Sequence, residues 1–118
     1  AEDEEKAQER AREKAFARAL ELALKLASKD WEVRKDACQE LGTLAGVLGA
    51  GAEVYLAALE AKVKVDKDNA VRSAARDALV QVKAAIGAEA ERKAAEAAKA
   101  RAAKAKQLRD SAPKREQG

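Results

Sequence analysis

The chain has 118 residues, of which 38% are charged and 47% are nominally hydrophobic, and its formal net charge is +3. Alanine supplies 32 residues, whereas Leu, Ile, Val and Phe together supply only 21. Strong helix formers therefore dominate, which excludes β architectures and predicts an all-α fold. His is absent and Cys38 is the only Cys, which excludes zinc sites, His-based catalysis and an intrachain disulfide. We therefore expect no catalytic centre, metal or cofactor, and we interpret Cys38 as a small helix-packing residue.

The first helix is predicted from about Asp3 to Ala27. Residues 2–14 are almost wholly charged, so this part should project into solvent or pack on another protein. From Phe16 onward, apolar residues recur at spacings of three and four, as in a helix that packs on a core: Phe16, Ala19, Leu20, Ala23, Leu24 and Ala27.

The second helix is predicted from Trp31 to about Leu48, where Gly49 and Gly51 permit the backbone conformations that end helices. Gly42 and Gly46 lie four residues apart and should let a neighbouring helix approach closely. The third helix is predicted from about Ala52 to Val65. It places Leu56, Leu59 and Val63 on one stripe and Tyr55 off that stripe.

A fourth helix is predicted from Asn69 to Ile86, ending at Gly87, and a fifth from Ala88 to Arg109. Residues 88–118 hold nine basic and five acidic groups, so the positive charge of the chain is concentrated at this end. Leu108 is the only large apolar residue of the fifth helix, which should form by propensity and by charge pairs such as Glu89 with Lys93 and Glu96 with Lys99. Residues 111–118, which include Pro113, are predicted to be a disordered tail.

An internal repeat with an offset of 38 residues links the second and fourth helices. The segment beginning Asp30-Trp-Glu-Val-Arg recurs as Asp68-Asn-Ala-Val-Arg. Val33, Ala37, Leu41 and Leu44 match Val71, Ala75, Leu79 and Val82, and their spacing places each set on one helix face. Asp30 and Asp68 stand where each helix begins, and we predict that they are N-caps.

The pattern Asp-x-x-Val-Arg-x-x-Ala-x-x-x-Leu resembles the HEAT and HEAT-like (armadillo-type) helical repeats over residues 30–87. The resemblance implies a short α-solenoid of about two antiparallel helix pairs. It also implies that Asp30, Arg34, Asp68 and Arg72 form a structural ladder between successive repeats. The chain would then divide into a charged helix packing on the repeats (1–29), the repeats (30–87), a basic helix (88–110) and the tail.

The opening Ser-Lys-Asp-Trp31-Glu-Val-Arg is also similar to the TOG subclass of HEAT arrays, in which a Trp near a helix start touches tubulin. The second copy has Asn69 in place of Trp. Trp31 is therefore either a packing residue at the helix start or a contact to a partner. Tyr55 is a further candidate contact.

Two functions fit this sequence. The first is a non-catalytic protein–protein interaction module, a small subunit or adaptor of a larger assembly, because two repeats with few large apolar residues make a marginal core that a partner would stabilise. The alternative is a binder of nucleic acid or another acidic surface. The contacts would come from five basic residues of the C-terminal helix: Lys99, Arg101, Lys104, Lys106 and Arg109. The same residues are candidate contacts to a protein partner. The alternative is that they form a solvent-exposed helix face with no binding role.

Other expectations concern class and compartment. HEAT-like repeats also resemble the bilin lyase family, but nothing in this sequence supplies an active site. Gly42, Gly46 and the irregular repeat argue against an idealised designed protein. The longest uncharged run, Leu41 to Ala52, is shorter than the roughly 20 residues of a membrane span, so we expect a soluble chain in a reducing compartment. The absence of Met favours a processed product, such as an organellar protein, or a fragment.

Overall fold

The computed structural model describes residues 2–111, and within this range the chain is helical with short turns. The elements are α1 (Glu2–Lys25), α2 (Trp31–Leu48), the 3₁₀ segment η1 (Gly49–Tyr55), α3 (Leu56–Val65) and α4 (Asn69–Ser111). The all-α prediction is confirmed. The predicted tail lies outside the described residues, apart from Ser111, which is the last residue of α4.

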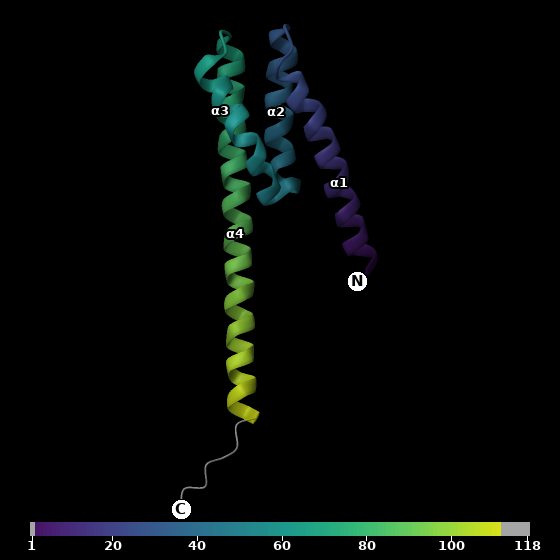
Figure 1. Ribbon diagram of the computed structural model, residues 1–118, viewed down its shortest axis with the longest axis vertical. Coiled ribbons are helices and arrows are strands. Elements are labelled where there is room, and N and C mark those ends of the chain that lie inside the picture. Colours follow the sequence, from purple (N-terminus) through teal and green to yellow (C-terminus); the bar gives the residue numbers. More distant parts are fainter. Residues whose placement is uncertain (1, 112–118) are drawn as a thin grey trace, which may run out of the picture.

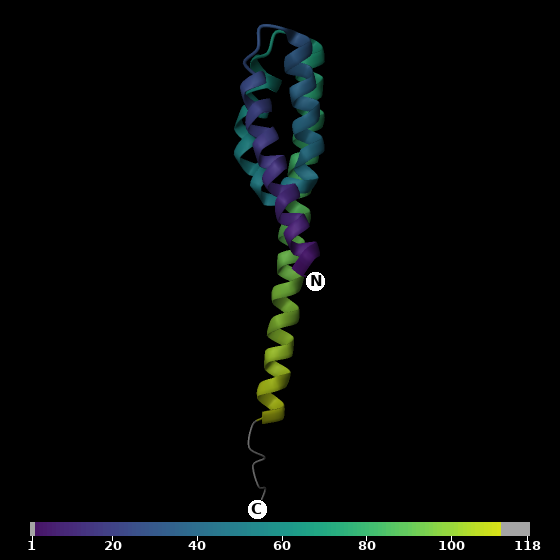
Figure 2. The same cartoon turned by 90° about the vertical axis from the view of Figure 1, so that its right-hand side faces the viewer.

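The helices form two antiparallel hairpins, α1 with α2 and α3 with α4, that lie side by side (Figure 1). Figure 2 shows two layers, with α1 and α3 in one and α2 and α4 in the other. The turns that join the two helices of each hairpin lie at the same end of the molecule, and α2 and α4 run in the same direction (Figure 1). The central contact of the bundle is therefore between α2 and α4.

The core consists of small and medium side chains between these layers. Its largest fully buried members come from all four α-helices: Leu22, Leu41, Leu59, Val71, Val82 and Cys38. The predicted apolar faces of α2 and α4 are therefore largely confirmed, because Ala37, Leu41, Val71, Ala75 and Val82 are buried. Leu44 and Leu79 are partly buried against this core.

The face of α1 that enters the core matches the prediction only in part: Ala19 is buried and Phe16 and Ala23 pack against the core, but Ala27 is exposed. Ala15, Ala19, Leu22 and Leu26 are buried, whereas Leu20 and Leu24 are 64% and 79% exposed. Leucines at positions 20, 22, 24 and 26 put large apolar side chains on opposite sides of the helix, so the sequence did not identify which side is buried. Residues 2–14 are exposed, as predicted.

The ends of α2 follow the sequence prediction. The helix spans Trp31–Leu48, and Gly49 has a φ of 57°, a conformation that favours glycine. The predicted third helix is wrong in its first part, because Ala52 to Tyr55 belong to η1 and the α-helix begins at Leu56. Tyr55 is buried in the core rather than displayed on the surface.

The predicted break at Gly87 is also wrong, because α4 is one helix of 43 residues. A glycine inside a helix costs only about 1 kcal/mol relative to alanine, and here its neighbours are strong helix formers. Gly87 has no positive φ. The predicted fourth and fifth helices are therefore the two halves of α4.

Gly42 allows the close approach of α2 and α4. A Cβ atom at this position would lie 3.0 Å from the Cα of Ala78. We expect Gly42→Ala to destabilise the chain, because overpacking costs about 1–3 kcal/mol and offsets the gain of about 1 kcal/mol in helix propensity. Gly46→Ala is the matched control: a Cβ there meets nothing within 4 Å, so it should stabilise. Urea denaturation measures the free energy of unfolding of both variants. A Gly46→Ala variant that is less stable than the unchanged chain would contradict the packing argument.

Candidate functional site

The turns that precede α2 and α4 have the same local structure. In the first turn, the Ser28 hydroxyl accepts a hydrogen bond from the amide of Asp30 at 3.2 Å. In the second, the Asp66 carboxylate accepts from the amide of Asp68 at 3.0 Å. The Asp30 and Asp68 carboxylates each accept from the amide two residues on, at 3.0 and 2.9 Å. Both act as helix caps, as predicted.

Arg34 joins the two turns. Its Nε and Nη2 donate to the carboxylate oxygens of Asp66 at 2.8 and 3.2 Å. Its Nη1 donates to the carbonyl oxygens of Ser28 and Lys29 in its own turn, at 2.9 and 3.1 Å. The side chains of Arg34 and Asp66 are both buried. The carboxylate that Arg34 binds across the repeats is therefore Asp66 and not Asp68, which corrects the predicted ladder.

Arg72 repeats half of this arrangement. Its Nη1 donates to the carbonyl oxygen of Asp66, six residues earlier, at 2.6 Å, just as Arg34 donates to Ser28. Its Nη2 donates to the Asn69 side chain, and it forms no ion pair with any carboxylate of residues 2–111. Arg72 therefore anchors its own turn.

Sequence reasoning missed Asp66, although a signal was present. The 38-residue offset aligns Asp66 with Ser28, so the residue two positions before each cap differs between the repeats. Burial alone would raise the pKa of Asp66, but the hydrogen bonds from Arg34 and from the Asp68 amide outweigh it and lower the pKa below its ordinary value. Asp66 is thus a buried, ionised partner of Arg34.

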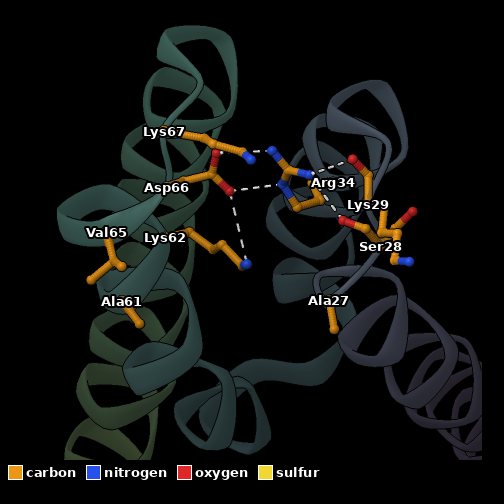
Figure 3. Close-up of a pocket in the computed structure, with 9 residues that line it drawn as sticks. All are labelled: Ala27, Ser28, Lys29, Arg34, Ala61, Lys62, Val65, Asp66 and Lys67. Atoms are coloured by element: carbon orange, nitrogen blue, oxygen red, sulfur yellow. Dashed lines mark hydrogen bonds and ion pairs between the residues drawn. The ribbon is translucent and has the colours of Figure 1, made fainter.

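A groove of about 670 Å³ opens beside this ion pair, between the end of α1 and the end of α3 (Figure 3). Lys29, Lys62 and Lys67 are among the residues that line it, as is Val65, which is 80% exposed. Lys62 Nζ lies 3.8 Å from the Asp66 carboxylate. Arg34 and Asp66 already satisfy each other, so the groove presents positive charge and some apolar surface.

Cys38 is fully buried and unpaired. Burial raises the pKa of its thiol to about 11. It therefore stays protonated at neutral pH, which agrees with its predicted role as a packing residue. Within residues 2–111, no three His, Cys, Asp or Glu side chains gather as metal ligands would.

Trp31 begins α2 at the end of the molecule where the two turns lie. It is 41% exposed, and the Nζ of Lys35 lies 5.7 Å from the ring centroid, close enough for a cation–π contact. Trp31 therefore retains surface for a partner while packing partly on its own helix. Tyr55, the other aromatic candidate, is only 6% exposed and offers no such surface in this fold.

The second half of α4 projects from the bundle as a single helix (Figures 1 and 2). Every residue from 90 to 111 is exposed, including Lys99, Arg101, Lys104, Lys106 and Arg109. The bundle ends at Glu89, whose carboxylate accepts a hydrogen bond from the amide of Ala50 in η1. This bond lowers the pKa of Glu89. The predicted pair with Lys93 is present at 3.6 Å. The predicted pair of Glu96 with Lys99 is not among the ion pairs of residues 2–111.

The stretch Trp31–Val65 is long and apolar enough to cross a membrane by length and composition alone. The chain reverses direction within it, between α2 and α3 (Figure 1). Seven residues of α2 are buried in the bundle. The core helices of soluble proteins can be equally long and apolar, so this stretch is only weak support for a membrane span.

Comparison with protein-family models, curated proteins and solved structures gave no match for this chain.

Proposed function

We propose that this chain is a non-catalytic helical-repeat module for protein–protein interaction, a small subunit or adaptor, and that the second half of α4 is its docking surface. The observation that carries the proposal is the exposure of residues 90–111 around their whole circumference. These 22 residues extend about 33 Å, and Leu108 is their only large apolar side chain. A helix of this kind needs external contacts to remain ordered.

The arrangement of the hairpins supports the interpretation of residues 30–87 as HEAT-like. The two hairpins repeat the same antiparallel pairing, and Arg34 of the first hairpin bonds to Asp66 of the second. On this interpretation Arg34 and Asp66 form the one rung of the ladder. In the first turn the residue equivalent to Asp66 is Ser28, which has no carboxylate. If two copies of the chain stacked head to tail, Arg72 of one copy would therefore find no ion-pair partner at Ser28 of the other, and the ladder would not continue.

Truncation after Glu89 tests the docking surface, because it keeps the bond to Ala50 and removes only the projecting part. We expect the truncated chain to keep the unfolding transition of its core and to lose its place in the native assembly. In the full chain, amide exchange over residues 90–111 should be fast in isolation and slow in the assembly. Retained assembly after truncation, with residues 90–111 unprotected, would refute this surface and leave the Trp31 end as the next candidate.

A nucleic-acid binder remains the second candidate function. It is favoured by the five exposed basic side chains from Lys99 to Arg109, which form no ion pairs within residues 2–111. If all five contact phosphates, the logarithm of affinity for a DNA duplex should fall with the logarithm of salt concentration with a slope of about −4 to −5. A slope near zero would exclude phosphate binding by this helix.

A further inference from the structure

One face of the projecting helix is basic along its length. Lys93, Arg101 and Lys104 are spaced so that they share this face with Ala97. Lys93 also pairs with Glu89 of its own chain at 3.6 Å, so Arg101 and Lys104 are the members of this face without a partner within residues 2–111. Leu108 follows one turn beyond and is 62% exposed. None of the acidic residues of the projecting helix, Glu91, Glu96 or Asp110, falls on this face. The face therefore has a basic section followed by an apolar end.

The first half of α1 carries the complementary face. Glu2, Glu5, Glu9 and Glu13 are spaced three, four and four residues apart, which places them on one side of the helix. Together with Lys6, the first three of these glutamates line one surface hollow. All four are exposed, and none forms an ion pair within residues 2–111. The face continues toward Leu20, which is 64% exposed.

The two faces match in length as well as in charge. Glu2 and Glu13 are 11 residues apart, as are Lys93 and Lys104, which corresponds to about 16 Å of helix. Each face is followed, toward the C-terminus, by an exposed leucine: Leu20 after Glu13 and Leu108 after Lys104. If the two helices paired in parallel, the acidic side chains of α1 would therefore lie opposite the basic side chains of α4, and the two leucines would lie at the same end of the pair.

A single chain does not bring these faces together. The first half of α1 and the second half of α4 extend past η1 on opposite sides of α2 and run in opposite directions (Figure 1). No ion pair joins them within residues 2–111. Within residues 2–111, the two faces therefore do not meet each other.

We infer that the basic face of α4 binds the acidic face of α1 in a second copy of this chain. Around a two-fold axis perpendicular to the long axis, each α4 would run antiparallel to the other α4 and parallel to the other α1. The dimer would contain the same α1–α4 contact twice, as a two-fold interface requires. This inference rests on the proposed function, because it gives the docking helix its partner. Exposed ion pairs are individually weak, so the association should be salt-sensitive.

A charge exchange between the two faces tests the dimer by sedimentation of the full chain at low salt. The first variant is Arg101→Glu/Lys104→Glu, and the second is Glu5→Lys/Glu9→Lys. Each alone opposes like charges at both contacts and should weaken self-association about tenfold or more. An equimolar mixture should sediment as a dimer, because the reversed α4 meets the reversed α1 and the two unchanged faces meet each other.

The matched control is Lys99→Glu/Lys106→Glu, which makes the same change in net charge on another side of α4 and should leave the dimer intact. A wild-type chain that stays monomeric would overturn the inference, as would a mixture no more dimeric than its components. The proposed function fails separately, if truncation after Glu89 leaves the native assembly unchanged. A monomeric full chain that loses the assembly on truncation would contradict the dimer and retain the docking surface.

Discussion

The substitution Asp66→Ala is expected to lower the free energy of unfolding by about 3 kcal/mol, because it leaves the buried guanidinium of Arg34 without its carboxylate. Both carboxylate oxygens accept hydrogen bonds from Arg34, and the side chain of Asp66 is only 3% exposed. Urea denaturation with a far-UV circular dichroism readout measures the loss.

Asp68→Ala is the matched control, two residues along the same turn. Asp68 caps α4 through the amide of Ala70 and pairs with no arginine, so its removal should cost only about 1 kcal/mol. Equal losses for the two variants, or a larger loss for Asp68→Ala, would restore Asp68 as the inter-repeat partner and contradict the assignment of Asp66.

The same ion pair should produce a pH dependence with a defined sign. Because the pKa of Asp66 is lowered in the folded chain from its ordinary value of 3.8, the unfolded chain takes up the proton first as the pH falls. The contribution of Asp66 is complete above that ordinary value and is lost as the pH falls through the folded pKa. The stability difference between wild type and Asp66→Asn should therefore narrow in acid.

Local signals in the sequence predicted the parts of the fold that depend on local chemistry. The caps at Asp30 and Asp68 follow from the affinity of a carboxylate for free helix amides, and the end of α2 at Gly49 from the conformation available to glycine. The fold class followed from helix propensity. The 38-residue repeat indicated which helices are equivalent, and its apolar positions largely matched the core.

Features that depend on competition between local signals, or on contacts between distant groups, were not predictable in this way. Gly87 carries a helix-ending signal, but the preference of its neighbours for helix outweighs it. Asp66 became visible as a partner only when the fold placed it opposite Arg34. The exposure of the basic residues on α4 was expected from the scarcity of apolar neighbours. The separation of the acidic half of α1 from them depends on how the hairpins pack.

The burial of α1 provides the second large expected effect. Leu22→Ala should lower the free energy of unfolding by about 3 kcal/mol, because the side chain is 2% exposed and its loss leaves a cavity between α1 and α2. Leu22 belongs to the core, and a bundle with so few large apolar residues has little surplus packing to close such a gap. Thermal or urea unfolding of the full chain measures the change.

Leu20→Ala tests the same helix with the same chemical change on its other side. Leu20 is 64% exposed, so its truncation should change stability by about 0.5 kcal/mol or less, and the slightly better helix propensity of alanine offsets part of that. The spacing of Phe16, Leu20 and Leu24 had favoured this side as the buried one. A larger loss for Leu20→Ala than for Leu22→Ala would mean that α1 packs through that stripe, turned about its axis from the arrangement in Figure 1. The acidic face that continues from Leu20 to Glu2 would then turn toward the bundle and be closed to a second copy.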